Sequence, residues 1–192
     1  MISDHGVEGA TTRRICAKAD MPLASFHYAF ESRIALLQAV MDTAVPTDLT
    51  NMLDTIVAAD VATSPSSRET MRHSMYQHLH VFYALLKADP GRMQATISLG
   101  IYAHKHPELQ PAGRQMYERL YDVAALGLEA SARKTGIEWD QPVRELAPVI
   151  IATANAITLI YLSTADDAVV DQIISSTCDA MSHHVVGTAT RA

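Results

Sequence analysis

Apolar residues recur with the spacing of an α-helix along almost the whole chain, and the most informative part of this pattern lies near its beginning. The periodicity predicts a short helix over about residues 12–19 and a second over about residues 22–29. Pro22 separates them, because proline disfavours helical geometry at the preceding residue and fits the first turn of the next helix. Ser32 is placed to cap a third helix. Two short helices joined by a tight turn form the pattern of a helix-turn-helix.

The second predicted helix divides into an inner and an outer face. Phe26 and Phe30 lie four residues apart and are expected to pack inward. The outer face then carries Leu23, Ala24, Ser25, His27 and Tyr28. Arg13 on the first helix can contact guanine edges or phosphate, and the hydroxyl and imidazole groups of the outer face can bond a base or the DNA backbone. These residue types predict a surface that binds the major groove of DNA.

Four stretches follow one another in roughly the first fifth of the chain: Gly9-Ala10-Thr11-Thr12-Arg13-Arg14-Ile15, Asp20-Met21-Pro22, Ser25-Phe26-His27-Tyr28-Ala29-Phe30, and Ser32-Arg33 followed by Ala35-Leu36-Leu37. Together they resemble the DNA-binding domain of the TetR family of transcriptional regulators. Asp20 stands where the family usually has glycine, and His27 where it usually has tyrosine. Leu23, Ala24 and Ala29 also depart from the family pattern, and these departures concern the operator sequence more than the fold.

The resemblance implies a DNA contact at each matching position. The phosphate contacts would come from Thr11, Thr12, His27, Tyr28 and Arg33. The contacts inside the major groove would come from Arg13, Leu23, Ala24 and Ser25. An alternative interpretation is that these residues are only the solvated face of a small helical subdomain.

A helix-turn-helix of this type needs a helix before the motif to complete its core. Met1–Gly6 has the character of the last turn of such a helix, and Gly6 suits a left-handed C-terminal cap. We therefore expect that most of this first helix is missing, either because the chain begins late or because its DNA-reading function is impaired. The two motif helices, each about eight residues long, would then depend on packing against the third helix.

The charge of this segment is balanced. Up to residue 35 the basic residues are Arg13, Arg14, Lys18 and Arg33, and the acidic ones are Asp4, Glu8, Asp20 and Glu31. The whole chain has a formal net charge of −6 and a pI near 5.8. Because non-specific DNA affinity comes from phosphate neutralisation, the basic patch of a typical DNA-binding protein is not predicted here.

The rest of the sequence predicts an all-α fold. We expect helices over about residues 32–62 (interrupted at Pro46), 67–88, 91–104, 111–134, 142–163 and 166–186. No strand pattern and no internal repeat stands out. The predicted organisation is a helix-turn-helix DNA-binding domain over residues 1–42 and a helical ligand-binding and dimerisation domain over residues 43–192.

The last two predicted helices have the character of a dimer interface. Residues 149–162 are apolar on nearly all sides, and such a helix must be buried all round. A partner subunit is the simplest cover in a domain of this size, although the central helix of a monomer would fit the same pattern. The resemblance implies the same arrangement, because TetR-family proteins dimerise through their last two helices.

The middle helices carry polar groups on apolar faces, which is typical of a small-molecule pocket. The candidate ligand-binding residues are Tyr76, His80, Tyr83, Met93, Ile97, Tyr102, Tyr117, Tyr121, Asn155 and Thr158. For any one of them, an ordinary place in the core is the alternative interpretation.

Other chemistries have little support. Among the nine histidines, the close pairs lack the spacing of three or four that metal sites on one helix use, so no metal and no cofactor is predicted. No phosphate loop, nucleophile elbow or paired carboxylates favour an enzyme. Cys16 and Cys178 are expected to be free thiols. The apolar run over residues 148–162 is too short for a membrane span and contains polar residues, so a cytoplasmic protein is predicted.

The sequence as a whole predicts a ligand-responsive one-component transcriptional regulator, a repressor, that binds palindromic double-stranded DNA as a homodimer. A small apolar or amphipathic effector would release it from DNA. The alternative is a dimeric helical ligand-binding protein that no longer binds DNA. An enzyme on an all-α scaffold is a third and weaker possibility.

Overall fold

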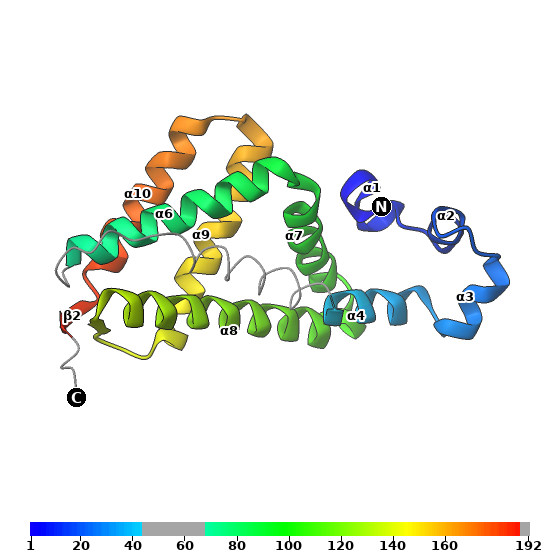
Figure 1. The fold of residues 1–192 in the computed structure, drawn as a ribbon. Coiled ribbons are helices and arrows are strands. Elements are labelled where there is room, and N and C mark those ends of the chain that lie inside the picture. The colour runs from blue at the N-terminus through cyan, green and yellow to red at the C-terminus, as the bar shows by residue number, and fades with distance from the viewer. Residues whose placement is uncertain (44–67, 189–192) are drawn as a thin grey trace. The chain divides into compact units, whose positions relative to one another are not determined.

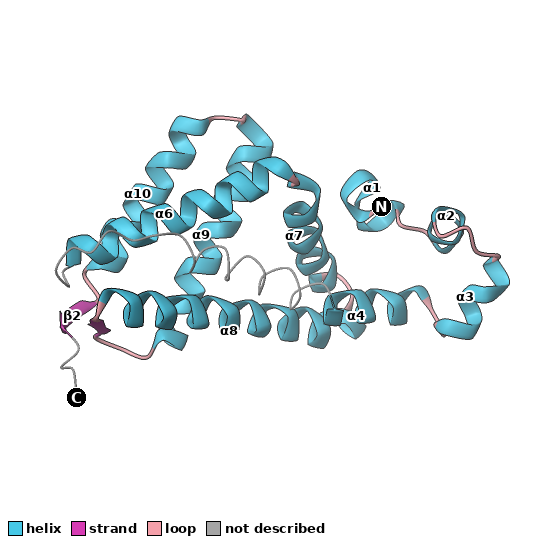
Figure 2. Cartoon of the chain, viewed as in Figure 1, coloured by secondary structure: helices cyan, strands magenta, loops and turns pink. Residues whose placement is uncertain are grey.

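The structure is a computed structural model that describes residues 1–43 and 68–188 (Figure 1). Its helices are α1 (Ile2–Gly9), α2 (Thr12–Lys18), α3 (Leu23–Ala29), α4 (Arg33–Thr43), α6 (Arg68–Ala88), α7 (Pro90–His104), the 3₁₀ helix η1 (Pro107–Leu109), α8 (Gln110–Thr135), α9 (Val143–Thr164) and α10 (Asp167–Ser182). Two short strands, β1 (Ile137–Trp139) and β2 (Val185–Thr188), complete the described part of the chain (Figure 2). The predicted all-α class is confirmed.

The chain forms two compact units, and neither is a continuous stretch of sequence. The described residues of the first unit are 1–43 and 89–119, and those of the second are 68–88 and 120–188. The helix-turn-helix segment therefore folds together with α7, η1 and the first part of α8. The predicted boundary at residue 42 separates a DNA-binding part from a ligand-binding and dimerisation part. That functional division stays a prediction.

Local side-chain hydrogen bonds set the ends of the motif helices. The Thr11 hydroxyl accepts from the Arg14 amide at 3.4 Å before α2, and the Ser32 hydroxyl accepts from the Ala35 amide at 3.1 Å before α4. The chain turns between α2 and α3 at Asp20, which has a positive φ of 52°. Glycine adopts this conformation most readily. The turn therefore explains why the family that the motif resembles usually has glycine at this position.

Close helix contacts hold the first unit together. A Cβ atom added to Gly100 would lie 2.9 Å from the Tyr117 ring, and one added to Gly113 would lie 2.8 Å from the Ala103 side chain. Only glycine allows α7 and α8 to approach so closely. Around this contact the unit buries Leu37, Met41, Leu99, Leu109 and Met116, each no more than 2% exposed. Helix α4 therefore belongs to the same core as α7 and α8.

The second unit is built around α10, which packs against both α6 and α9. The side chains of Met71, Leu86, Leu146, Ile157, Ile174 and Met181 are at most 1% exposed. These residues come from α6, α9 and α10. They recur along each helix at the spacing that predicts a buried face. The apolar periodicity of the sequence thus accounts for this core.

The C-terminal helix prediction is wrong beyond Ser182. Helix α10 ends there, and β2 pairs antiparallel with β1, with Trp139 opposite Val185. The Asp140 amide donates to the His184 carbonyl oxygen at 2.8 Å and extends the pairing. Strands of three and four residues are too short for an alternating pattern to be read from sequence, which is why this pair was missed.

The remaining predicted helices agree with the structure to within a few residues at their ends. The exception is the helix predicted over residues 32–62, because α4 ends at Thr43. The remainder of that prediction, including the interruption at Pro46, lies outside the described residues.

Candidate functional site

The helix-turn-helix presents most of the predicted DNA contacts to solvent. Tyr28 is 93% exposed and Leu23 is 41% exposed. Exposed positions also include Thr11, Arg13, Ala24 and His27, whereas Thr12 and Ser25 are half-buried. The exposed contacts on α2 and α3 are thus accessible from solvent, and the roles of all the predicted contacts on DNA stay predictions.

The inner face of α3 explains this orientation. Phe26 is only 5% exposed, and its ring lies 5.8 Å from that of Phe30, centroid to centroid. Burial of a phenylalanine side chain is worth about 1.5–3 kcal/mol, which holds α3 in one rotation about its axis. Because Phe26 faces inward, Ala24 and Tyr28, two residues away on either side, must face outward. Leu23, at the first position of α3, is exposed as well.

Arg33 differs from the other predicted contacts, because its guanidinium is engaged within the protein. Its Nε donates to the Ala10 carbonyl oxygen at 2.9 Å, and its Nη2 donates to the Val7 carbonyl oxygen. Its Nη1 donates to the Tyr102 hydroxyl at 2.9 Å. The half-buried guanidinium therefore joins the end of α1 to α7. The phosphate contact inferred for Arg33 stays a prediction, and the structure gives this side chain a clear internal role.

Tyr102 continues this connection along α7. The Arg33 guanidinium carbon lies 5.4 Å from the centre of the Tyr102 ring, and the His106 ring stacks on the same ring with centroids 3.8 Å apart. His106 Nδ1 lies 2.9 Å from the Tyr102 carbonyl oxygen. Tyr102 is only 8% exposed, and its hydroxyl accepts from Arg33. Its predicted role in ligand binding stays a prediction.

Two further contacts connect α4 to the same segment. The Gln38 side-chain amide donates to the Glu108 carbonyl oxygen at 3.1 Å. The Arg119 guanidinium donates to the Asp42 carbonyl oxygen at 2.7 Å and lies 3.0 Å from the Asp42 carboxylate. A cation at a helix C-terminus is favoured by the helix dipole. Helix α4 is thus linked near its beginning, middle and end to α7, η1 and α8.

Basic charge near the motif is partly compensated. Lys18 Nζ lies 3.2 Å from the Asp4 carboxylate, and the hydrogen bond from Lys18 is the main cause that lowers the pKa of Asp4. Both side chains are exposed, so this ion pair contributes little to stability. It does remove one cation from the charge available to DNA phosphates, in line with the balanced charge of the segment.

The predicted ligand residues of α6 face α10. The Tyr76 hydroxyl donates to the Asp171 carboxylate at 2.5 Å, and His80 Nε2 lies 3.0 Å from the same oxygen. The Tyr83 hydroxyl donates to Asp167. The hydrogen bond from Tyr76 is the largest cause that lowers the pKa of Asp171, and burial raises the pKa of Tyr83 well above its ordinary value. These tyrosines form a polar seam between two helices.

The other predicted ligand residues are distributed over both units. Met93, Ile97, Tyr102 and Tyr117 belong to the first unit, and Tyr121, Asn155 and Thr158 belong to the second. The Thr158 hydroxyl donates to the Ala154 carbonyl oxygen of its own helix at 2.8 Å, and Arg144 lies over the Tyr121 ring. Within each unit these residues have partners of their own, and their role in ligand binding stays a prediction.

A second polar face of α6 was missed by the sequence reasoning. Ser74 is completely buried, and its hydroxyl has no hydrogen-bond partner among the residues that the structure describes. The buried Gln77 Oε1 atom, one turn further on, likewise has none in the described part of the chain. On the same side of α6, the Ser131 hydroxyl of α8 lies 3.3 Å from His78 Nδ1. Unpaired buried atoms of this kind are candidates for hydrogen bonds to a bound ligand. The available signal was the pair of polar residues Ser74 and Gln77, three apart beside the apolar Met75.

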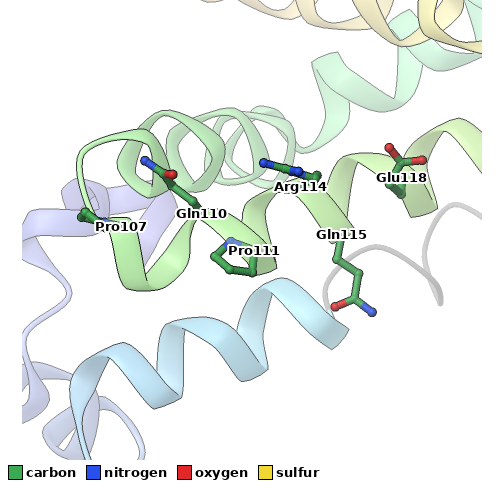
Figure 3. Close-up of a pocket in the computed structure, with 6 residues that line it drawn as sticks. All are labelled: Pro107, Gln110, Pro111, Arg114, Gln115 and Glu118. Atoms are coloured by element: carbon green, nitrogen blue, oxygen red, sulfur yellow. The ribbon is translucent and has the colours of Figure 1, made fainter.

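A surface groove of about 430 Å³ lies in the first unit (Figure 3). It is lined by Pro107, Gln110, Pro111, Arg114, Gln115 and Glu118. All six residues are exposed, and none of them was predicted to bind a ligand. Their open arrangement at the surface does not match the enclosed site that a small apolar effector requires.

Helix α9 keeps an apolar face exposed within its own unit. Val149, Leu159 and Leu162 are 44%, 49% and 39% exposed, and Val169 at the beginning of α10 is 39% exposed. At 22 residues α9 is also long and apolar enough to cross a membrane. The helix is thus longer than the apolar run over residues 148–162 that was judged too short for a membrane span.

The chain is similar to known transcriptional regulators both in sequence and in fold. The chain is 23% identical to the HTH-type nicotine-responsive transcriptional repressor HdnoR of Paenarthrobacter nicotinovorans, over 87% of this chain and 80% of that protein. No protein-family model matches the sequence.

Solved structures extend the likeness over almost the whole chain. A TetR-family transcriptional regulator from Mesorhizobium loti matches with a TM-score of 0.65 and 13% identity, over 96% of this chain and 90% of that one. The regulator FadR from Bacillus subtilis, in complex with stearoyl-CoA, matches with a TM-score of 0.61 and 12% identity, over 96% and 94%. A regulator from Saccharomonospora viridis, in complex with choline, matches with a TM-score of 0.58 and 17% identity, over 97% and 92%.

The chain thus has the all-α, TetR-like fold of the transcriptional regulators to which it is similar. The resemblance inferred from the helix-turn-helix motif is confirmed, because the TetR-like fold extends far beyond the segment on which the inference was based.

Proposed function

We propose that this chain is a one-component transcriptional repressor that binds palindromic operator DNA as a homodimer and is released by a small apolar or amphipathic effector. The observation that carries the proposal is the helix-turn-helix, whose predicted groove contacts Arg13, Leu23 and Ala24 are exposed on one outer surface. Such a protein acts in the cytoplasm. In a two-fold dimer, recognition helices about 34–36 Å apart meet successive major grooves.

The effector part of the proposal is supported by the similar proteins and by the contacts of α4. HdnoR is named as nicotine-responsive, and two similar regulators were solved with choline and with stearoyl-CoA. In this chain Arg33, Gln38 and Arg119 link α4 to the α7–η1–α8 segment. An effector that binds one position of this segment more tightly than another favours that position, and α4 carries the helix-turn-helix with it. The equilibrium between the two positions changes by no more than the difference in effector affinity.

The dimer part is supported by the exposed apolar face of α9. Val149, Ala152 and Leu159 are exposed, and their spacing places them on one side of the helix. A contiguous apolar face of this kind is typical of an interface. The outcome expected from ultracentrifugation is a dimer, and Leu159→Glu should produce monomers because it buries an unpaired charge.

DNA binding is tested directly with labelled duplexes from the region that flanks the chain's own gene. We expect Arg13→Ala to weaken binding and relax the choice of base, because arginine is the side chain that most often reads guanine. Arg133→Ala is the matched control, since Arg133 is an exposed arginine of α8 outside the motif. Equal effects of the two substitutions would show that Arg13 acts only through net charge.

The second candidate is a dimeric ligand-binding protein that does not bind DNA. The balanced charge of the motif favours it, together with the pairing of Lys18 with Asp4. The same titration separates the two candidates, because the second predicts no binding to any of the duplexes at moderate salt.

A further inference from the structure

A run of exposed apolar residues spans the turn and the first part of α3. Met21 is 49% exposed and Leu23 is 41% exposed, and Pro22 and Ala24 are exposed beside them. A single exposed apolar residue is common, but a contiguous group with two large side chains indicates a contact surface. We refer to Met21, Pro22, Leu23 and Ala24 as the apolar tip.

The local backbone fixes this tip in an outward position. The Met21 amide donates to the Cys16 carbonyl oxygen at 2.9 Å, directly after the left-handed turn at Asp20. Phe26 is buried one turn further along α3. The buried Phe26 fixes the rotation of α3 about its axis, and with it the exposed positions of Leu23 and Ala24.

The tip occupies the part of a helix-turn-helix that meets base edges, since the first residues of the recognition helix enter the major groove. The side chains of Pro22, Leu23 and Ala24 have no hydrogen-bonding group, and the Met21 thioether is only a weak acceptor. In the major groove the apolar feature of a base edge is the C5-methyl group of thymine, and apolar side chains are its usual partners. Apolar side chains in contact with the hydrogen-bonding edge of guanine or cytosine would instead leave polar groups without partners.

We infer that the apolar tip reads thymine methyl groups, so that each operator half-site carries thymines where Met21, Leu23 and Ala24 meet the groove. This inference rests on the proposed DNA-binding function. It makes Leu23 a specificity-determining residue, whereas Arg13 and Ser25 supply the hydrogen bonds to the remaining bases. Apolar contacts also suit a motif whose basic and acidic residues balance, because they do not depend on phosphate neutralisation.

The test begins with the full 192-residue chain and a pool of random duplexes from which bound sequences are selected. The selected half-sites should share thymines, and each of these is then replaced singly by deoxyuridine, which removes only the C5-methyl group. Affinity should fall about fourfold for each contacted methyl, which corresponds to roughly 0.8 kcal/mol of apolar burial. Replacements at other thymines should have no effect.

Two variants assign the effect to the tip. In Leu23→Ala, one thymine of each half-site should lose its sensitivity to deoxyuridine, since the side chain that meets its methyl group is gone. The matched control is Leu85→Ala, which shortens a leucine of α6 that is 39% exposed and lies outside the motif. This variant should keep the full deoxyuridine effect and the same selected sequence.

The outcomes separate this inference from the function on which it rests. If no duplex is retained from the random pool, the proposed DNA-binding function is overturned, and thymine reading with it. If duplexes are retained but deoxyuridine binds as tightly as thymidine at every position, the chain binds DNA and the inference about the tip is wrong. The inference is also wrong if Leu23→Ala and Leu85→Ala behave alike.

Discussion

Ser74 offers the sharpest test of the buried polar face of α6. Its hydroxyl is fully buried and lacks a hydrogen-bond partner in the described part of the chain. Burying such a group without a partner costs about 1–3 kcal/mol. Alanine has nearly the same volume, so Ser74→Ala removes this penalty without opening a cavity. We therefore expect Ser74→Ala to raise the free energy of unfolding by about 1 kcal/mol, against the usual direction of core substitutions.

Ser131→Ala is the matched control, since Ser131 is also a buried serine, only 4% exposed, but its hydroxyl lies 3.3 Å from His78 Nδ1. Losing this hydrogen bond should lower the free energy of unfolding by about 1 kcal/mol. The assay is urea and thermal unfolding at fixed protein concentration, and for a chain of this size 1 kcal/mol shifts Tm by about 2–4 °C. Destabilisation of both variants by the same amount would refute the argument from the unpaired hydroxyl.

Four further outcomes are expected. Tyr102→Phe removes the acceptor of the Arg33 bond and should cost about 1–2 kcal/mol in urea unfolding, and an unchanged midpoint would contradict the role of this contact. Asp166→Ala should lower Tm through a loss of about 1 kcal/mol, because the Asp166 carboxylate accepts from two amides that begin α10, and Asp166→Asn should restore most of it. Asp20→Gly should stabilise the chain by about 1 kcal/mol in thermal unfolding by relieving a φ of 52°, and a lower Tm would argue against strain there. Burial raises the pKa of Cys178 to about 11, so iodoacetamide at pH 8 should modify it only after unfolding, as read by peptide mass spectrometry, and labelling of the native protein would be the contrary result.

The helices were predictable because their signals are local. Apolar spacing and capping residues such as Thr11, Ser32 and Asp166 act within one or two turns. The first residues of α2, α4 and α10 therefore lie close to where the sequence predicts them. The outward orientation of Ala24 and Tyr28 also follows from the buried Phe26 by helical geometry alone. The β1–β2 pair joins residues that lie far apart in sequence, and no local pattern indicates such a pairing.

The partners of polar side chains were not predictable for the same reason. Tyr76 and Tyr83 were assigned to a ligand pocket because aromatic hydroxyls lay on a largely apolar helix. Their partners, Asp171 and Asp167, belong to a helix at the other end of the chain. Arg33 likewise finds Tyr102, 69 positions later in the sequence. Periodicity shows which face of a helix is polar, but only the fold shows which residue meets it.

The joining of residues 1–43 with residues 89–119 in one unit also has a consequence for synthesis. The helix-turn-helix leaves the ribosome first, yet α4 cannot make its bonds to Glu108 or Arg119 until those residues have emerged. At about 5–20 residues per second, the wait for some 75 further residues lasts on the order of 4–15 seconds. During this time Leu37 and Met41, which are buried in the finished unit, have no α7 or α8 to cover them. The nascent chain therefore has a period in which chaperone binding at α4 would be favoured.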